Sequence, residues 1–409
     1  MTLTYRPSAS DDQLPAFPMA RACPFSPPPA YQQMREERPV APVRLWNGKK
    51  VWLVSRFGDV RKILADKRVS NNILHPGFPL LYEARSAVFK QYDKPPYFHF
   101  MDPPQHTENR RMLTQDFSVI RVKEMEEEIQ SIVDGTIDGM LASSGRSADL
   151  VHAIALPVPM RVIAGILGIP YADVVPLNRM MSGTAGFNQD PQEAKNAYAR
   201  LNDYVSELIA RKEANPSTDT ISRLISDQLH PGNLDRPALV RLIVFLLIVG
   251  HETTASMISL GTLMLLQHDE QREQLTRDPS LMQSAVEELL RYLSIVHLTT
   301  CRVAIEDIEI GGETIKAGEG IVALVSSANR DMSQFENPDV LDFNRGAKAH
   351  VAFGFGVHQC LGQTLARAEL RITLNSILRK IPTLKLAQPV EDLKFKAYIN
   401  GVQSMIVAW

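Results

Sequence analysis

Apolar residues recur along most of the chain with the three- and four-residue spacing that is typical of α-helices. The longest such pattern covers residues 234–267 and predicts one helix of roughly 34 residues, about 50 Å long. Its middle is apolar nearly all round, so we expect this helix to be buried. Residues 123–214 also have a mostly helical pattern, whereas 51–55 and 384–409 contain short strand-like stretches. The pattern therefore predicts a mainly α protein with small β-sheets.

The bulk composition is that of a soluble globular protein. The chain has 409 residues, of which 44% are hydrophobic and 22% charged, and this is enough for a sizeable core. A net charge of −2 provides no general attraction to nucleic acid. Residues 1–21 lack an apolar core of signal-peptide length, and the most apolar run, 242–249, is shorter than the about 20 residues that cross a bilayer. We therefore expect no nucleic-acid partner and no membrane anchor.

The three cysteines, Cys23, Cys301 and Cys360, lie far apart in the sequence. This distribution argues against a disulfide scaffold and suits a reducing cytoplasm. Cys360 follows two glycines, Gly354 and Gly356, and precedes a helical pattern. The apolar positions of that pattern are Leu361, Leu365, Ala368 and Ile372.

Cys360 is thus predicted to end a glycine-rich loop at the N-terminus of a helix. Free backbone N–H groups and the helix dipole favour a thiolate at such a position. One thiolate cannot hold zinc, but it can be the one protein ligand of a haem iron. A buried, unreactive cysteine is the alternative interpretation.

Residues 353–362 match every fixed position of the haem-binding signature F-G-x-G-x-H-x-C-x-G. By this signature the chain resembles the cytochromes P450. The resemblance implies haem b, iron protoporphyrin IX, as the cofactor and Cys360 as the ligand of its iron. It also implies that Phe353 and the loop glycines, Gly354 and Gly356, pack against the proximal face of the haem, and that Gly362 belongs to the cofactor-binding residues. The fold expected from it is a single domain over residues 1–409, a triangular α-rich prism around a buried haem, with 1–22 as a flexible lead-in.

The predicted long helix contains Gly250-His251-Glu252-Thr253 in its apolar middle. A glutamate in a buried helix is costly unless it is paired or hydrated. The sequence His251-Glu252 begins a zinc-protease motif, but Ala255 replaces the second histidine of H-E-x-x-H, so this interpretation fails. A structural glutamate beside a threonine is the plain alternative.

The resemblance assigns this segment to oxygen activation. It implies that Glu252 and Thr253 are the acid–alcohol pair that organises water and delivers protons. Gly250 would keep that side of the helix thin over the haem. Val249 departs from the small residue usual at its position, so we expect a tighter oxygen pocket.

The resemblance implies that four basic residues contact the haem propionates. His106 and Arg110 stand four residues apart, on one face of a predicted helix, where a solvated basic face is the alternative. A histidine and a bidentate arginine suit a carboxylate physically. The resemblance therefore assigns His106 and Arg110 to the propionates, and it assigns Arg302 and His358 the same role.

The pattern E-x-x-R occurs at Glu288 and Arg291, on a helix that begins near a capping-box sequence at Ser280. On a surface helix Arg291 could pair equally with Glu287, at little gain in stability. The resemblance selects Glu288 and Arg291, joined by Arg345, as a buried cluster that supports the cysteine loop.

The function implied is a haem-thiolate monooxygenase of the soluble bacterial type, located in the cytoplasm. It would use molecular oxygen to hydroxylate or epoxidise a hydrophobic secondary metabolite or xenobiotic, because residues 74–100 are rich in aromatic and aliphatic side chains. No nucleotide-binding motif is present, so electrons are expected from a ferredoxin and an NAD(P)H-dependent ferredoxin reductase. Arg111, Lys348 and Arg367 are candidate docking charges, or ordinary solvated surface.

Two other functions remain open at this point. Residues 327–331 and 335–338 are similar to the fungal nitric oxide reductases of the same family, which lack the acid that Glu252 provides here. A haem-binding sensor without turnover is the second alternative. The intact Glu252-Thr253 pair favours oxygen activation over both.

Overall fold

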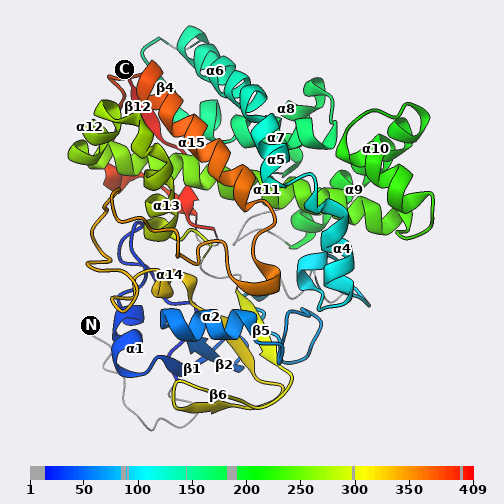
Figure 1. Ribbon diagram of the computed structural model, residues 1–409, viewed down its shortest axis with the longest axis vertical. Coiled ribbons are helices and arrows are strands. Elements are labelled where there is room, and N and C mark those ends of the chain that lie inside the picture. Colours follow the sequence, from blue (N-terminus) through cyan, green and yellow to red (C-terminus); the bar gives the residue numbers. More distant parts are fainter. Residues whose placement is uncertain are drawn as a thin grey trace. The chain divides into compact units, whose positions relative to one another are not determined.

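The structure is a computed structural model, and it describes residues 14–83, 89, 92–143, 145–181, 191–296, 300–396 and 399–409. The chain divides into two compact units. Unit 1 contains the described residues up to Thr107 together with 288–341 and 347–360. Unit 2 contains 108–287, 342–346 and 361–409. Figure 1 shows the elements of both units, and each unit is described here by itself.

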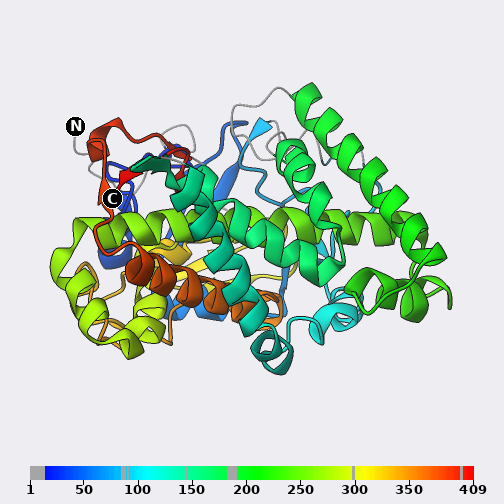
Figure 2. The same cartoon turned by 90° about the horizontal axis from the view of Figure 1, so that it is seen from above.

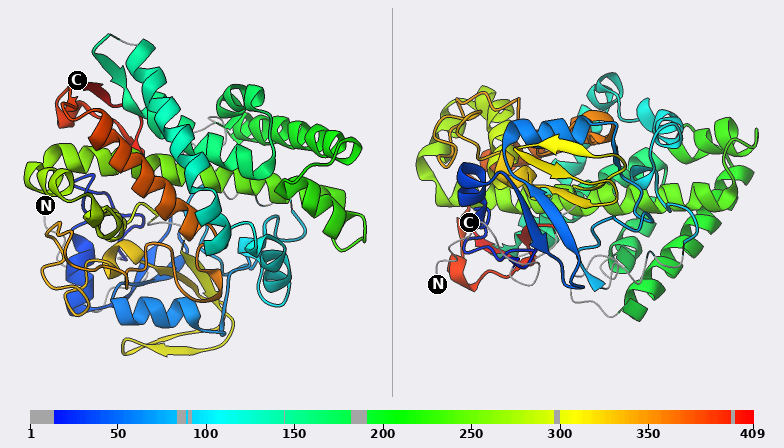
Figure 3. Two further views of the ribbon diagram at one scale, coloured as in Figure 1. Left: turned by 45° about the horizontal axis from the view of Figure 1, so that its top comes forward. Right: turned by 90° about the horizontal axis from the view of Figure 1, so that it is seen from below.

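Unit 1 is built on a five-stranded sheet with the order β1-β2-β8-β5-β3. The strands of this unit are β1 (Val40–Arg44), β2 (Lys50–Val54), β3 (Val69–Ser70), β5 (Cys301–Ala304), β6 (Ile308–Ile310), β7 (Glu313–Ile315) and β8 (Gly320–Ala323). Strands β2 and β8 are parallel, whereas the other neighbours in the sheet are antiparallel. β6 and β7 form a separate hairpin. Figure 3 (right) shows the blue and yellow strands of the sheet lying side by side.

The helices of unit 1 cover this sheet and complete its core. They are α1 (Ala30–Glu37), α2 (Phe57–Ala65) and α14 (Val325–Ala328), with short 3-10 turns at Phe98–Phe100 and Gly356–His358. α2 buries Phe57, Val60, Ile63 and Leu64, whose spacing gives one apolar face. Asp331 accepts a hydrogen bond from the backbone N–H of Phe57 (2.8 Å), so a side chain distant in sequence satisfies the start of α2.

Unit 2 is mainly helical. Its helices are α5 (Val119–Glu124), α6 (Glu126–Ser143), α7 (Pro157–Leu167), α8 (Val174–Met181), α9 (Pro191–Ala214), α10 (Thr220–Leu224), α11 (Arg236–Gln267), α12 (Asp269–Arg277) and α15 (Gln363–Lys380). Helices α4 (Gln105–Thr114) and α13 (Met282–Leu293) give residues to both units. π-helical turns lie at Val151–Ala155 and Ile225–Leu229, and 3-10 turns at Tyr171–Asp173, Pro279–Leu281 and Val390–Asp392.

Short strands complete unit 2. They are β4 (Ser147–Asp149), β9 (Lys385–Leu386), β10 (Phe395–Lys396), β11 (Gly401–Val402) and β12 (Ile406–Ala408). They form a three-stranded sheet, β4-β12-β9, and the two-stranded pair β10-β11. The predicted fold class, mainly α with small sheets, is therefore confirmed.

The predicted long helix is α11, and its bounds differ from the prediction by two residues at the start. Asp235 caps it by accepting a hydrogen bond from the backbone N–H of Ala238 (2.7 Å), and Pro237 lies in its first turn. Helices α7, α9 and α15 pack against it, so its apolar surface is largely buried within unit 2 (Figure 2). By length and composition α11 could cross a membrane, and it is the one described helix of which this is true.

The chain near the N-terminus corrects one prediction. Residues 14–22 do not form a loose lead-in, because Phe17 is 3% exposed and Ala16 forms a bridge with Arg44. The backbone N–H of Phe17 donates to the Arg44 carbonyl at 2.9 Å. Residues 1–13, the rest of the predicted lead-in, lie outside the described part of the chain.

Candidate functional site

The loop that carries Cys360 is closed and attached to α2. The backbone N–H of Cys360 donates to the Phe353 carbonyl at 2.9 Å, which joins the two ends of the loop. α15 begins three residues later, at Gln363, so the predicted position before a helix N-terminus is confirmed. The thiol of Cys360 belongs to an exposed residue, although the loop around it is half-buried.

Both loop glycines have positive φ angles, +73° at Gly354 and +75° at Gly356. A Cβ atom at Gly356 would lie 2.5 Å from the backbone oxygen of Leu64, at the end of α2. A Cβ atom at Gly354 would meet nothing within 4 Å. Gly356 is thus needed for a close approach to α2, and Gly354 for its backbone conformation alone.

Two of the predicted propionate residues lie together in unit 1. His106 is 1% exposed, and its ring centroid is 4.1 Å from that of His358 in the cysteine loop. His106 lies in the first turn of α4, where its backbone N–H donates to the Asp102 carbonyl at 2.9 Å. The structure therefore brings together two histidines that are about 250 positions apart in the sequence.

Arg302 is a buried cation on β5. It is 5% exposed, and its guanidinium donates to the side-chain oxygen of Asn71 and to the Cys301 carbonyl, both at 2.8 Å. Burial lowers its pKa to about 10, against smaller opposite effects of Cys301 and Asp102. In the described part of the chain no carboxylate lies within 4.0 Å of this guanidinium. A buried arginine with neutral partners fits a cofactor that carries carboxylates, as haem does.

Arg110 lies in the part of α4 that belongs to unit 2 and is half-buried. Its backbone carbonyl accepts a hydrogen bond from the Thr114 hydroxyl at 2.9 Å. Gly362 is the residue before α15. The roles of Arg110 and Gly362 toward a haem stay predictions.

The middle of α11 holds Glu252 in an ion pair. One carboxylate oxygen lies 3.3 Å from the Nζ of Lys396, and the two side chains are 17% and 25% exposed. This glutamate thus has the partner that we expected it to need. This partner is Lys396 of β10, which the sequence pattern did not indicate. Thr253 donates its hydroxyl to the Val249 carbonyl at 2.9 Å, so the two residues of the predicted acid–alcohol pair have different partners.

The neighbours of Glu252 attach α11 to α7. His251 is buried, and its Nε2 lies 3.1 Å from the Leu156 carbonyl. Burial lowers the pKa of His251 to about 4, so its ring is neutral near pH 7 and its Nε2 donates this hydrogen bond. A Cβ atom at Gly250 would lie 3.3 Å from Ile163 of α7. Gly250 thus has a packing role against α7, and its predicted role over the haem stays a prediction.

The E-x-x-R pair forms as predicted. Glu288 and Arg291 are 1% and 0% exposed and are joined by two bonds of 2.7 Å. Arg291 also donates to the carbonyls of Asn329 and Pro338, both at 2.8 Å. The Asn329 side chain accepts from the backbone N–H of Val351 (2.8 Å), which links the cluster to the residues just before the cysteine loop.

Two further predictions change with the structure. Arg367 forms a bidentate pair with Glu287 at 2.6 and 3.0 Å, so its guanidinium is already engaged and is a poor docking charge. Glu287 is therefore not the partner of Arg291. Arg345 lies in unit 2, and its part in the cluster stays a prediction.

Three aromatic residues of the stretch expected to form a substrate pocket are core residues of unit 1. Phe78 and Phe89 each pack edge-on against Phe100, at centroid distances of 6.2 and 5.2 Å. All three belong to the hydrophobic cluster on one face of the sheet. Residues 84–88 and 90–91 of the same stretch lie outside the described part.

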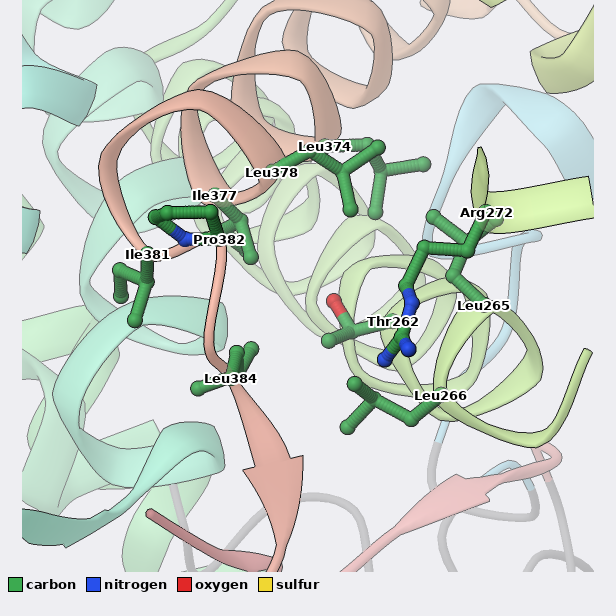
Figure 4. Close-up of a pocket in the computed structure, with 10 residues that line it drawn as sticks. All are labelled: Thr262, Leu265, Leu266, Arg272, Leu374, Ile377, Leu378, Ile381, Pro382 and Leu384. Atoms are coloured by element: carbon green, nitrogen blue, oxygen red, sulfur yellow. The ribbon is translucent and has the colours of Figure 1, made fainter. Parts of the chain in front are cut away.

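A small pocket lies between the C-terminal end of α11, α12 and α15 (Figure 4). Thr262, which lines it, comes ten positions after Glu252 on α11. The lining of the pocket is apolar apart from Thr262 and Arg272. Thr262 donates to the Ile258 carbonyl at 2.8 Å, and Arg272 pairs with Asp269 at 2.7 Å. Both polar groups are thus engaged, and the pocket offers no chemistry.

The chain is similar to known proteins over nearly its whole length. The sequence model of the family described as cytochrome P450 matches residues 171–392. The chain is 44% identical to pentalenic acid synthase of Streptomyces avermitilis, over 96% of this chain and 97% of that protein. It is 44% identical to vitamin D3 dihydroxylase of Streptomyces griseolus, over 97% of each. The crystal structure of GfsF matches with a TM-score of 0.91 and 41% identity, over 97% of this chain and 100% of that one.

Proposed function

The chain belongs to the cytochrome P450 family of haem-containing monooxygenases, and on this premise we propose that it inserts one oxygen atom into a hydrophobic organic molecule by hydroxylation or epoxidation. Its cofactor is haem b, and it requires oxygen, a substrate and a redox partner. The observation that carries the proposal is the loop of Cys360, an exposed cysteine on a hydrogen-bonded loop, with two buried basic residues, His106 and Arg302, in the same unit.

Cys360 would bind the haem iron as a thiolate, and Phe353 and Gly354 would pack beside it. His106, His358, Arg302 and, from unit 2, Arg110 would hold the propionates. When bound, the haem supplies the oxygen chemistry, and the thiolate ligand favours O–O cleavage. The hydrogen bond from the Cys360 N–H to Phe353 fixes the position from which the sulfur would act.

Glu252 and Thr253 would supply protons to the reaction. A carboxylate that is 17% exposed can take a proton from water and pass it on, whereas a fully buried one cannot exchange readily. The Thr253 hydroxyl can rotate away from the Val249 carbonyl to donate elsewhere. Val249 is 40% exposed although most of α11 is buried, so an apolar side chain lies accessible one turn before this pair.

The substrate class rests on this apolar side chain and on the relatives. One of them is named for a substrate, vitamin D3, and another for a product, pentalenic acid, so the names of relatives at similar identity point to no single molecule. We infer a hydrophobic secondary metabolite or xenobiotic, and electrons from a ferredoxin and its NAD(P)H-dependent reductase. A cytoplasmic location agrees with the small number of cysteines and their wide separation in the sequence.

The test is a visible spectrum of the reduced, carbon monoxide-treated holoprotein. A thiolate ligand gives a strongly red-shifted Soret band, which we expect in the wild type and not in Cys360→Ser. Cys23→Ser, which removes another exposed thiol, is the matched control and should keep the band. Persistence of the band in Cys360→Ser would contradict the assignment of Cys360 as the iron ligand. Reduction of nitric oxide directly by NADH would contradict the proposed monooxygenase reaction.

A further inference from the structure

The ion pair between Glu252 and Lys396 joins the middle of α11 to the β10–β11 pair, and neither the family signature nor the sequence pattern assigns Lys396 a role. Its Nζ lies 3.3 Å from Oε1 of Glu252. The same ammonium also lowers the pKa of the buried His251, after the larger effect of burial, so it acts on both ionisable residues of this turn. Lys396 therefore lies at the group proposed to carry protons.

The position of Lys396 is set by close packing of β11 on α11. A Cβ atom at Gly401 would lie 2.4 Å from the hydroxyl oxygen of Ser256 and 2.8 Å from its Cβ, so only a glycine allows this approach. Lys396 is the partner of Gly401 in the antiparallel register, and Gln403 N–H donates to the Lys394 carbonyl at 2.8 Å. The two strands are thus held together over this stretch.

Ser256 and Glu252 are four residues apart on α11 and share one face of the helix. The strand that touches Ser256 therefore brings its neighbour, β10, to the level of Glu252. The lysine side chain spans the remaining gap, with its ammonium on the carboxylate. Backbone packing thus determines which side chain Glu252 meets.

We propose that Lys396 is a positioning residue for Glu252, and this proposal rests on the monooxygenase function proposed above. Lys396 keeps the carboxylate of Glu252 in one orientation between proton transfers. The carboxylate must leave the ammonium to carry a proton and returns to it afterwards. The ion pair is partly exposed, so it can break and reform, unlike the fully buried Glu288–Arg291 pair. Without Lys396 the carboxylate samples several orientations, so protons are delivered less reliably and more peroxide is released.

The first readout is independent of turnover. An acetylating reagent is applied to the holoprotein, and modification of Lys396 is followed by peptide mass spectrometry. An amine held by a carboxylate reacts slowly, so we expect Glu252→Gln to speed the modification of Lys396 several-fold. The exposed Lys394 of the same segment is the internal reference and should not change. Equal rates at Lys396 in both proteins would overturn the ion pair.

The second readout is the hydrogen peroxide released for each NADPH oxidised by the substrate-free holoenzyme, with a plant-type ferredoxin and its reductase as electron donors. We expect Lys396→Met to raise this ratio at least two-fold, Lys396→Arg to restore it, and Lys394→Met to leave it unchanged. In a Glu252→Gln background Lys396→Met should have no further effect. A lowered unfolding temperature with an unchanged peroxide ratio would show a merely structural lysine and overturn the proposal.

These outcomes separate the two proposals. A wild type without the red-shifted carbon monoxide band, or without oxygen-dependent oxidation of NADPH, contradicts the monooxygenase function itself. A wild type that shows both, with Lys396→Met indistinguishable from it, contradicts the role of Lys396 alone.

Discussion

The support of the cysteine loop and the middle of α11 each contain a glutamate paired with a basic residue, but the two pairs differ in every physical respect. Glu288 and Arg291 come from one helix, are almost fully buried and are joined by two bonds of 2.7 Å. Glu252 and Lys396 are 144 positions apart, partly exposed and joined at 3.3 Å.

This difference suits two tasks. A buried pair whose remaining donors are satisfied by backbone carbonyls cannot open without leaving a charge in an apolar interior, so it holds the chain in one arrangement. A partly exposed pair has water as an alternative partner and opens at little cost. The molecule thus combines a fixed support linked to the residues before the cysteine loop with a partly exposed ion pair that can open.

The largest effect is expected from Arg291→Ala. This change leaves Glu288 buried without its cation and the carbonyls of Asn329 and Pro338 without a donor, so it should lower the free energy of unfolding by about 3–5 kcal/mol. Urea unfolding and the haem content of the purified protein measure the loss. Arg121→Ala, which breaks an exposed pair with Glu124, is the control and should cost under about 1 kcal/mol. Similar values for both variants would remove the distinction between a buried support and a surface pair.

An intermediate effect is expected at His251, in the middle of α11. Its pKa is about 4 in the folded protein and 6.5 as a reference, so between these values the unfolded chain binds a proton that the folded chain does not. Stability contributed by the neutral ring is therefore present above pH 6.5 and lost as the pH falls toward 4. Relative to His251→Gln, the wild type should lose about 2–3 kcal/mol between pH 7 and pH 4.5.

Urea unfolding at several pH values measures this difference, with the exposed His230→Gln as a control. A parallel course of wild type and His251→Gln over the whole range would show that the histidine takes up its proton over the same pH range in the folded and the unfolded chain. The buried hydrogen bond to Leu156 would then need another explanation.

The smallest effect distinguishes the two glycines of the cysteine loop. Both have positive φ, so alanine is strained at either position, but only at Gly356 would the new Cβ meet the backbone oxygen of Leu64. Gly356→Ala should therefore cost about 1–2 kcal/mol more than Gly354→Ala. Thermal unfolding of the two variants, with haem retention as a second measurement, makes the comparison. Equal losses would mean that contact with α2 does not hold the loop.

The sequence by itself determined the features that depend on neighbours a few residues away. The apolar period of residues 236–267 makes a buried helix, and Asp235 and Pro237 begin it. Glu288 and Arg291 are three residues apart on one helix, so their pairing follows from helical geometry. The order of Phe353, the two glycines and Cys360 likewise predicts a loop that closes before a helix, as observed.

Tertiary structure alone decided which distant groups meet. No pattern in the sequence indicates that Lys396 pairs with Glu252 or that Arg367 pairs with Glu287. The sequence contains many carboxylates, and only the folded backbone decides which of them lies beside a given basic residue. Likewise, an aromatic residue such as Phe100 is equally suited to a pocket and to a core, and the packing of unit 1 places it in the core. Local spacing specifies contacts within an element, whereas contacts between elements depend on how their backbones dock.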